Sequence, residues 1–380
     1  MSSDTNPLAS LRFGVASASL GMAKCHTLEL KLAALKKAGY RFAEVGFGDY
    51  VAWVRSRRPE LPKSTCPADW KEADEPDPSD TTLWNALYAE APKLVEYAAS
   101  CGLQLLALQP LNQFDGWPRG TSRAQWVRRK AEKWLPLCAL LKVELLQVGA
   151  NDYAEANASD QDTADDLRWI AELGARQQPP VKIAYEPWCF SKRVNTWEKA
   201  WELVQLGNHP NLGLCLDVAH FPLAPSYGWN PTTGEGWTDD QYREMLDRLA
   251  KVPGDKIFYL EISDVLKPVV PLGRGSPFDS WRQINRPPRG DIFCWTICGR
   301  PLPFVGKDAG RGVRSQDDMG GGRVLQSVRA VLRTGFKGPV MWEFFEAVNM
   351  EKNDPSIPEV YAQACRIAEQ GLRRGVLPQE

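Results

Sequence analysis

Short apolar runs alternate with longer amphipathic segments along the whole chain. A short apolar run is typical of a buried β-strand, and apolar positions spaced three or four apart indicate a helix with one buried face. The strands that this pattern predicts are residues 12–17, 42–46, 103–109, 143–149, 181–186, 211–217, 256–262 and 338–343. The helices that it predicts lie near residues 27–38, 83–101, 122–141, 161–177, 196–207, 238–250, 323–335 and 356–374.

The first predicted helix carries a start signal, an apolar face and a stop signal. Thr27 is a suitable N-cap, and Leu28, Leu32 and Leu35 recur on one face. Gly39 stands where a glycine commonly ends a helix. These features together predict a helix that starts after residue 27 and stops before residue 39.

Strict alternation of eight strands with eight helices predicts an α/β fold in which a parallel sheet closes into a (β/α)8 TIM barrel. An open, doubly wound sheet is the alternative, because periodicity does not show closure. No strand is followed by the G-x-G-x-x-G motif that would favour a nucleotide-binding open sheet. We expect the whole chain, residues 1–380, to form a single barrel domain.

Three segments interrupt the repeat, at residues 56–82, 221–237 and 263–322. Each is predicted to follow the carboxyl end of a strand, which is the face on which barrel enzymes build their active sites. None contains an apolar core of its own. We therefore expect long βα loops that form the walls or the lid of a substrate pocket.

Composition and charge limit the classes of partner that the protein could bind. The net charge of −1 gives no electrostatic footprint for nucleic acid or for an anionic membrane, and no apolar run is long enough for a membrane span. The nine cysteines are odd in number and scattered, which favours reduced thiols, and the first residues show no signal peptide. We expect a cytoplasmic protein that acts on a small-molecule substrate. Homo-oligomerisation stays open, because no segment identifies an interface.

Four acidic residues end, or nearly end, the last four predicted strands, and we call them the carboxylate ring: Glu186, Asp217, Glu261 and Glu343. Buried together, they would repel one another unless a cation lay between them. Oxygen ligands suit Mg²⁺ and Mn²⁺. The ring therefore predicts one divalent metal ion, and a proton or a nearby Lys or Arg would balance the remaining negative charge. The alternative is that these acids pair with basic side chains or cap the next helices.

Three more polar residues are expected at the same mouth. His220 follows Asp217 by three positions and is a candidate general base at neutral pH, although a lone histidine can also be structural. Gln109 ends the third predicted strand and Glu44 lies near the end of the second. We interpret both as candidate substrate contacts, and Glu44 could equally be a second acid/base or an ion-pair partner.

The residues around the ring resemble the 3-dehydroshikimate dehydratases, a group within the xylose-isomerase-like barrel superfamily. The likeness is carried by Tyr185-Glu186-Pro187-Trp188, Val194-Asn195-Thr196-Trp197-Glu198-Lys199-Ala200-Trp201 and Asn211-Leu212-Gly213-Leu214-Cys215-Leu216-Asp217. It continues in Leu108-Gln109-Pro110-Leu111, Phe258-Tyr259-Leu260-Glu261 and Trp342-Glu343-Phe344-Phe345. It extends from about residue 12 to about residue 370.

The resemblance implies a metal-dependent lyase that dehydrates 3-dehydroshikimate, or a related cyclic hydroxyketone, to an aromatic product such as protocatechuate. Glu186, Asp217 and Glu343 match three of the family's metal ligands, and Glu261 stands where the family has Gln or His. His220 matches the family's histidine, and we expect it to act in catalysis together with Glu186. In this chemistry the metal polarises a carbonyl, a base removes the neighbouring proton and the enolate expels hydroxide.

The sequence departs from the family at the residues expected to bind the substrate carboxylate. The expected Trp-Ser-Arg-Asn segment is Pro287-Pro288-Arg289-Gly290, which leaves Arg289 as the candidate clamp. Asn112 and Gln113 stand where basic residues are expected after the third strand. These differences favour a substrate less anionic than 3-dehydroshikimate.

The main alternative activity is a sugar or polyol isomerase or epimerase that uses the same proton abstraction. An endonuclease on this barrel would need a histidine-rich zinc cluster and a basic groove, which three histidines and a net charge of −1 argue against. A non-catalytic binding barrel is the remaining class, and it would be favoured by an absence of metal binding.

Overall fold

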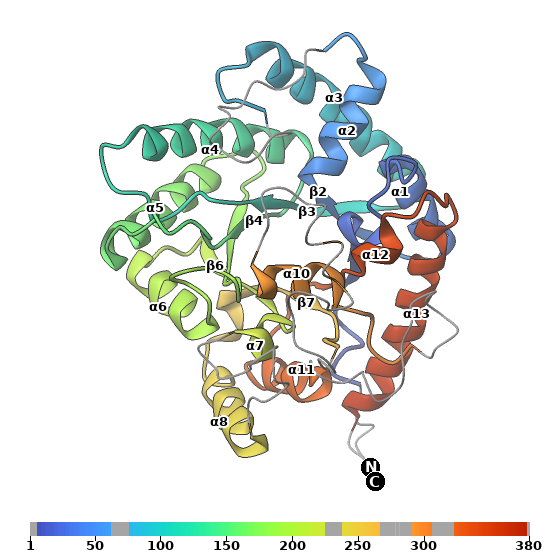
Figure 1. Ribbon diagram of the computed structural model, residues 1–380, viewed down its shortest axis with the longest axis vertical. Helices are drawn as coiled ribbons and strands as arrows, with labels where there is room; N and C mark the ends of the chain where they lie inside the picture. Colours follow the sequence, from blue (N-terminus) through green and yellow to red (C-terminus); the bar gives the residue numbers. More distant parts are fainter. Residues whose placement is uncertain are drawn as a thin grey trace.

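The computed structural model describes residues 6–61, 76–224, 238–266, 278, 281, 290–305 and 323–377. Within these ranges eight strands form a closed barrel in chain order (Figure 1). They are β1 (Phe13–Ala16), β2 (Phe42–Gly46), β3 (Gln104–Leu111), β4 (Leu145–Gly149), β5 (Lys182–Glu186), β6 (Leu212–Asp217), β7 (Ile257–Ile262) and β8 (Val340–Trp342). The predicted closed barrel is confirmed, and the open-sheet alternative is wrong.

Every pair of neighbouring strands is parallel, including the pair that closes the barrel, in which Phe13 of β1 aligns with Val340 of β8. Strands that are buried on both faces read as continuous apolar runs, because neither face meets water. This is why the strands could be located from apolar runs alone. β4 and β6, for example, are buried at every position.

Eight helices correspond to those that the pattern predicts, and they surround the barrel (Figure 1). They are α1 (Leu28–Lys37), α3 (Thr81–Ser100), α4 (Ser122–Leu140), α5 (Asp160–Ala175), α6 (Trp197–Gly207), α8 (Asp239–Leu249), α11 (Val324–Arg333) and α13 (Ile357–Val376). Thr27 caps α1 by accepting a hydrogen bond from the Leu30 amide, and Gly39 beyond its end has a φ of +78°. Both end signals of the first helix are therefore confirmed.

Within the described ranges, four further helices and two 3-10 turns are present that were not predicted. The helices are α2 (Phe47–Arg57), α7 (His220–Leu223), α10 (Asp291–Cys298) and α12 (Ala347–Met350), and the turns cover Ser17–Leu20 and Gly254–Lys256. The predicted loop bounds need correction: segment 56–82 starts inside α2 and ends inside α3, segment 221–237 starts inside α7, and segment 263–322 contains α10. Gly46 occupies the N-cap position of α2 and has no side chain that could cap the helix. No start signal therefore marks α2 in the sequence.

No helix within the described ranges is both long enough and apolar enough to cross a membrane. The cysteines in these ranges are free thiols, as their scattered positions predict, and Cys66 lies outside the described residues.

Candidate functional site

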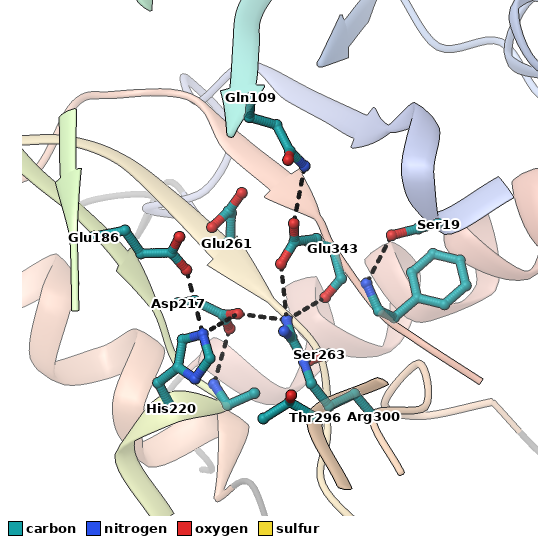
Figure 2. A network of polar contacts seen from close by, with 12 residues as sticks. Ser19, Gln109, Glu186, Asp217, His220, Glu261, Ser263, Thr296, Arg300 and Glu343 are labelled. Atoms are coloured by element: carbon teal, nitrogen blue, oxygen red, sulfur yellow. Dashed lines mark hydrogen bonds and ion pairs between the residues drawn. The ribbon is translucent and has the colours of Figure 1, made fainter. Parts of the chain in front are cut away.

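Strand alternation directs the carboxylate ring into the barrel. Side chains two positions apart on a strand face the same way. One buried cluster contains residues from six strands. Four of its members stand two residues before the acids of the ring: Ala184, Cys215, Tyr259 and Met341. That cluster fills the barrel interior, so the four carboxylates point inward just above it, at the carboxyl ends of β5 to β8 (Figure 2).

The ring is compact and buried. Its members are 1%, 1%, 0% and 6% exposed, in chain order, and one oxygen from each lies within 4.8 Å of the others. Two oxygens on opposite sides of a bound Mg²⁺ are about 4.2 Å apart, and slightly farther apart around larger ions. The four carboxylates therefore have a spacing that a single divalent ion could occupy.

Hydrogen bonding around the ring also fits a cation. Glu186 Oε1 is buried and accepts no hydrogen bond from any residue that the structure describes. Buried polar atoms normally have a partner, and an unsatisfied carboxylate oxygen is expected where an ion binds. Oxygen-only donors suit Mg²⁺, Mn²⁺ or a similar hard ion.

Burial also shifts the titration of the ring. It raises the pKa of Glu186 to about 8 and that of Glu343 to about 7, and it raises the pKa of Glu261 well above its usual range. The neighbouring carboxylates raise these pKa values further. Without a cation, part of the ring therefore holds protons near neutral pH. Cys215 Sγ and the Tyr259 hydroxyl, at 3.1 and 3.4 Å, donate to Glu261.

Arg300 brings a positive charge into the site. It is 2% exposed, its Nη2 forms an ion pair with Asp217, and the same atom lies 3.1 Å from Glu343 Oε2 (Figure 2). Its Nε donates to Ser263 Oγ at 3.0 Å, and its backbone pairs with Phe345, two residues beyond Glu343. The ring was expected to be balanced by a proton or by some Lys or Arg, but Arg300 itself was not predicted. Arg300 lies in segment 263–322 with no sequence signal that places it near the strands.

His220 begins α7 directly after β6 and faces the ring. Its Nε2 lies 3.4 Å from Glu186 Oε1 and 3.6 Å from Asp217 Oδ2, while its Nδ1 lies 3.1 Å from Cys189 Sγ. Burial lowers the pKa of His220 to about 4, so the imidazole is neutral at pH 7. A neutral imidazole can accept a proton or bind a metal, and Glu186, Asp217 and His220 also form a group with metal-ligand spacing.

Three further residues hold ring carboxylates in place. Gln109 Nε2 donates to Glu343 Oε1 at 2.9 Å. Glu186 Oε2 accepts from Gln147 Nε2 at 2.5 Å and from Trp188 Nε1 at 2.6 Å. Gln109 was expected at the mouth, but the other two were missed, although Gln147 was visible as a lone polar residue in the apolar run of β4.

Glu44 lies below the ring, and Arg289 lies outside the described residues. Glu44 is fully buried and accepts a hydrogen bond from the Tyr259 hydroxyl at 2.9 Å. Burial and the charge of Glu343 raise its pKa well above the usual range. Glu44 is not among the described residues that line the cavity above the ring. The predicted contacts of Glu44 and Arg289 with a substrate therefore stay predictions.

A cavity of about 210 Å³ opens above the ring. One side is polar, and the other is formed by Phe190 and by Phe293, Thr296 and Ile297 of α10. α10, which belongs to segment 263–322, lies across the mouth of the barrel (Figure 1). Pockets for drug-sized ligands measure roughly 300–1,000 Å³, so a smaller cavity suits a small molecule.

Comparisons with known proteins agree with this architecture. A family model described as a xylose isomerase-like TIM barrel matches residues 32–286, more than half of the chain. The 3-dehydroshikimate dehydratase of Neurospora crassa is 29% identical over 374 residues, which cover 93% of this chain and 92% of that protein. The crystal structure of the IOLI protein with a binding zinc atom has a TM-score of 0.59 at 19% identity and covers 97% of this chain and 100% of that one.

A D-psicose 3-epimerase from Clostridium cellulolyticum H10, solved with D-tagatose, is a second structural neighbour. Its TM-score is 0.54 at 13% identity, with 97% of this chain and 100% of that chain covered. At this identity the likeness concerns the fold. The family match, the closed eight-stranded barrel and the acids at its mouth agree with one another, and the chain belongs to the xylose isomerase-like TIM barrel family.

Proposed function

We propose that this protein is a divalent-metal-dependent lyase that dehydrates 3-dehydroshikimate, to protocatechuate, or a related cyclic hydroxyketone. The observation that carries the proposal is the carboxylate ring, which lies beside His220 at the base of a small cavity. The dehydratase of Neurospora crassa, similar over nearly the whole of both chains, supports this choice of reaction. We also propose that residues 1–380 form one barrel domain, since β1 near one end pairs with β8 near the other.

In this proposal the carboxylate ring holds one Mn²⁺ or Mg²⁺ ion. When bound, the ion supplies positive charge beside a substrate carbonyl and so acidifies the neighbouring C–H bond. Arg300 favours the ionised forms of Asp217 and Glu343 and holds both side chains in place, and Gln147 and Trp188 orient Glu186. Glu261, which is hydrogen-bonded to Cys215 and Tyr259, is the metal ligand at the position where the resemblance implies Gln or His.

His220 is the proposed base. Nδ1 lies 3.1 Å from Cys189 Sγ and also accepts a long hydrogen bond, 3.4 Å, from the Cys189 amide. The proposal requires the tautomer in which Nδ1–H instead donates to Cys189 Sγ and Nε2 keeps a lone pair on the side of the ring. Nε2 takes the proton from the carbon beside the substrate ketone, and the C–H electron pair forms a C=C bond. The hydroxyl on the next carbon leaves and is protonated to water by the imidazolium. Tautomerisation of the remaining ring then gives the aromatic product.

The test is direct. The purified protein is incubated with Mn²⁺ or Mg²⁺ and 3-dehydroshikimate, and the aromatic product is followed by its ultraviolet absorbance. We expect product with metal and a large loss of turnover in His220→Asn at unchanged metal affinity. An absence of product at every metal concentration would overturn the dehydratase proposal, and full turnover in His220→Asn would assign His220 a structural role.

A sugar or polyol isomerase or epimerase is the second candidate. The observation that favours it is the amide-rich wall of the cavity, where Gln109, Asn112 and Gln113 could bind hydroxyl groups. Such an enzyme would exchange a substrate C–H proton with solvent. Incorporation of deuterium from D₂O into a keto-sugar, without formation of an aromatic product from 3-dehydroshikimate, would support this candidate over the first.

A further inference from the structure

Arg300 has one nitrogen atom that its contacts within the described ranges do not use. Its Nε donates to Ser263 Oγ at 3.0 Å. Its Nη2 donates to the backbone oxygen and to Oε2 of Glu343, at 2.9 and 3.1 Å. Nη1 forms no hydrogen bond with any described residue. A guanidinium group has five N–H donors, so both hydrogens of Nη1 are available to a bound molecule.

Nη1 also has access to the cavity above the ring. Arg300 is 2% exposed, and it lines that cavity. In the described part of the chain, the fully buried atoms without a hydrogen-bond partner include Glu186 Oε1 and Asp217 Oδ2, but not Nη1. Because Nε and Nη2 are turned toward protein acceptors, Nη1 is the nitrogen of Arg300 that a ligand can reach.

The position of the guanidinium is fixed from several sides. Ion pairs with Asp217 and Glu343 hold one nitrogen, and the hydrogen bond to Ser263 holds a second. The guanidinium carbon lies 5.2 Å from the centroid of the Phe345 ring, and the backbones of Arg300 and Phe345 pair with each other. A donor that is held in place in this way can stabilise a developing negative charge without first having to reorient.

Arg300 and the proposed base are neighbours of the same carboxylate oxygen. His220 Nε2 lies 3.6 Å from Asp217 Oδ2, and Arg300 Nη2 forms its ion pair with that oxygen (Figure 2). Both residues also line the cavity, so one small molecule can contact both. In a ketone, the oxygen and the acidic C–H group are attached to neighbouring carbon atoms. This short span fits a base and a donor that lie close together.

We propose that Arg300 is a catalytic residue whose Nη1 donates a hydrogen bond to the ketone oxygen of the substrate. The inference rests on the proposed function in that it requires a ketone substrate, which both candidate reactions have. As His220 Nε2 removes the proton from the neighbouring carbon, the C–H electron pair forms a C=C bond and the carbonyl pair moves onto the oxygen. Nη1 stabilises this enolate oxygen, and Arg300 keeps its own proton throughout.

The role depends on a donor at contact distance rather than on an excess of positive charge. Asp217 and Glu343 already balance the guanidinium, and Glu186 and Asp152 add negative charge to the lining of the cavity. These acids would oppose an anionic group beside Arg300, but a ketone oxygen is neutral when it binds. Its charge develops only as the proton is removed, so the contact is stronger in the transition state than in the bound substrate.

Arg300→Lys tests the role in turnover. The lysine keeps a positive charge for Asp217 and Glu343, but it lacks the fork that could bind them and the substrate together. We expect kcat to fall about a hundredfold or more, with little change in KM and in Mn²⁺ affinity. The deuterium isotope effect for substrate labelled at the carbon beside the ketone should increase, because proton removal becomes slower. Arg248→Lys, which alters an exposed ion pair with Glu198, is the matched control and should retain full turnover.

Equilibrium binding to the Mn²⁺-loaded protein tests the same contact without turnover. Protocatechuate retains the former ketone oxygen as a hydroxyl group, and 4-hydroxybenzoate lacks it. The preference of the wild type for protocatechuate should fall about tenfold or more in Arg300→Lys, the loss expected for one hydrogen bond to a charged group. Ser263→Ala is the second variant, for the case that Arg300→Lys does not fold. It removes only the acceptor of Nε, and it should lower both kcat and the preference by a smaller factor.

The outcomes separate this role from the proposed reaction. Unchanged kcat and an unchanged preference in Arg300→Lys, or in Ser263→Ala if only that variant folds, would overturn the role. A loss of kcat that saturating Mn²⁺ reverses would also overturn it, because Arg300 would then act only through the metal site. A lowered preference for protocatechuate in a protein whose wild type dehydrates nothing would refute the proposed reaction and leave the contact with Arg300 standing.

Discussion

Arg300 is buried among carboxylates, and its effect on the protein depends on whether a metal ion is present. It pairs with Asp217 and lies 3.1 Å from Glu343, both of which are nearly inaccessible to solvent. Removing one partner from a buried ion pair costs roughly 3–5 kcal/mol, because a charge is left unpaired. We expect Arg300→Met to lower the melting temperature of the metal-free protein, and saturating Mn²⁺ to restore part of the loss.

Scanning calorimetry with and without Mn²⁺ measures this effect. The control is Arg243→Met, which removes an exposed ion pair with Asp240 and should change little. A loss of stability in Arg300→Met that is the same with and without Mn²⁺ would contradict the idea that Arg300 and the ion both balance the charge of the ring.

Gly149 makes room for the tryptophan that orients Glu186. A Cβ at position 149 would lie 2.0 Å from Cζ2 of Trp188, whose Nε1 donates to Glu186. We expect Gly149→Ala to displace the indole, to lower Mn²⁺ affinity and to cost about 1–3 kcal/mol of stability. Titration with Mn²⁺ and urea unfolding check these two effects. Gly48→Ala is the control, since a Cβ there meets no described atom within 4 Å. Unchanged Mn²⁺ affinity in Gly149→Ala would show that Trp188 does not contribute to metal binding.

The positions of the ring acids could be predicted from the sequence, but the side chains that contact them could not. The acids end apolar strands, and alternation alone directs them inward, so their convergence was predictable. Arg300 and Trp188 reach Glu343 and Glu186 through loops, and loop geometry is not encoded in any local period. The role of Gly149 likewise depends on a side chain from the following βα loop.

At the scale of elements, α2 is attached to α3 by a cluster of charges. Glu90 of α3 is 1% exposed and accepts from Arg57 at 3.1 Å, Arg58 at 3.0 Å and Lys93 at 2.7 Å. Burial alone would raise the pKa of Glu90, but these three donors lower it to about 2. α2 was not predicted although Phe47, Tyr50, Val51 and Val54 give it an apolar face at helical spacing; only a side-chain N-cap is missing at its start.

Glu90→Gln should therefore destabilise the protein in a pH-dependent way. A lowered pKa in the folded state means that the stabilisation is complete above the unfolded pKa of about 4.5 and is lost as the pH falls toward 2. Because the three basic partners are nearly half exposed, we expect about 1–2 kcal/mol at pH 7 rather than the full value of the shift.

Urea unfolding of Glu90→Gln and wild type at pH 7 and at pH 3 gives the difference directly. The loss in free energy of unfolding should be smaller at pH 3 than at pH 7. Exposed Glu132→Gln on α4 should unfold with nearly the same free energy as wild type at either pH. A difference that does not change with pH would mean that the packing of Glu90, rather than its charge, stabilises this pair of helices.

At the scale of the molecule, the order of the strands followed from their alternation with helices. Parallel strands need crossovers, so eight strand–helix units in sequence leave the closed barrel as the simplest arrangement, and β1 to β8 adopt it. The helices in the long βα segments could not be predicted in this way. α10 and α12 are short, and their buried residues Cys294, Cys298 and Ala347 pack against one another in one cluster.

The carboxylate ring joins four strands that are separated by up to 157 residues in the sequence, from Glu186 to Glu343, so an ion bound there would link half of the barrel. A ligand that binds only the folded state at a hundred times its dissociation constant stabilises it by about 2.7 kcal/mol. With the average unfolding entropy per residue, this corresponds to a rise in melting temperature of about 3 °C for a chain of this length. We expect Mn²⁺ to produce such a rise and EDTA to reverse it. Glu186→Gln and Asp217→Asn should abolish the rise, and exposed Glu244→Gln should retain it. If both ring variants kept the full metal-dependent shift, the ion would bind elsewhere, and the charge of the ring would have to be balanced by protons and Arg300 alone.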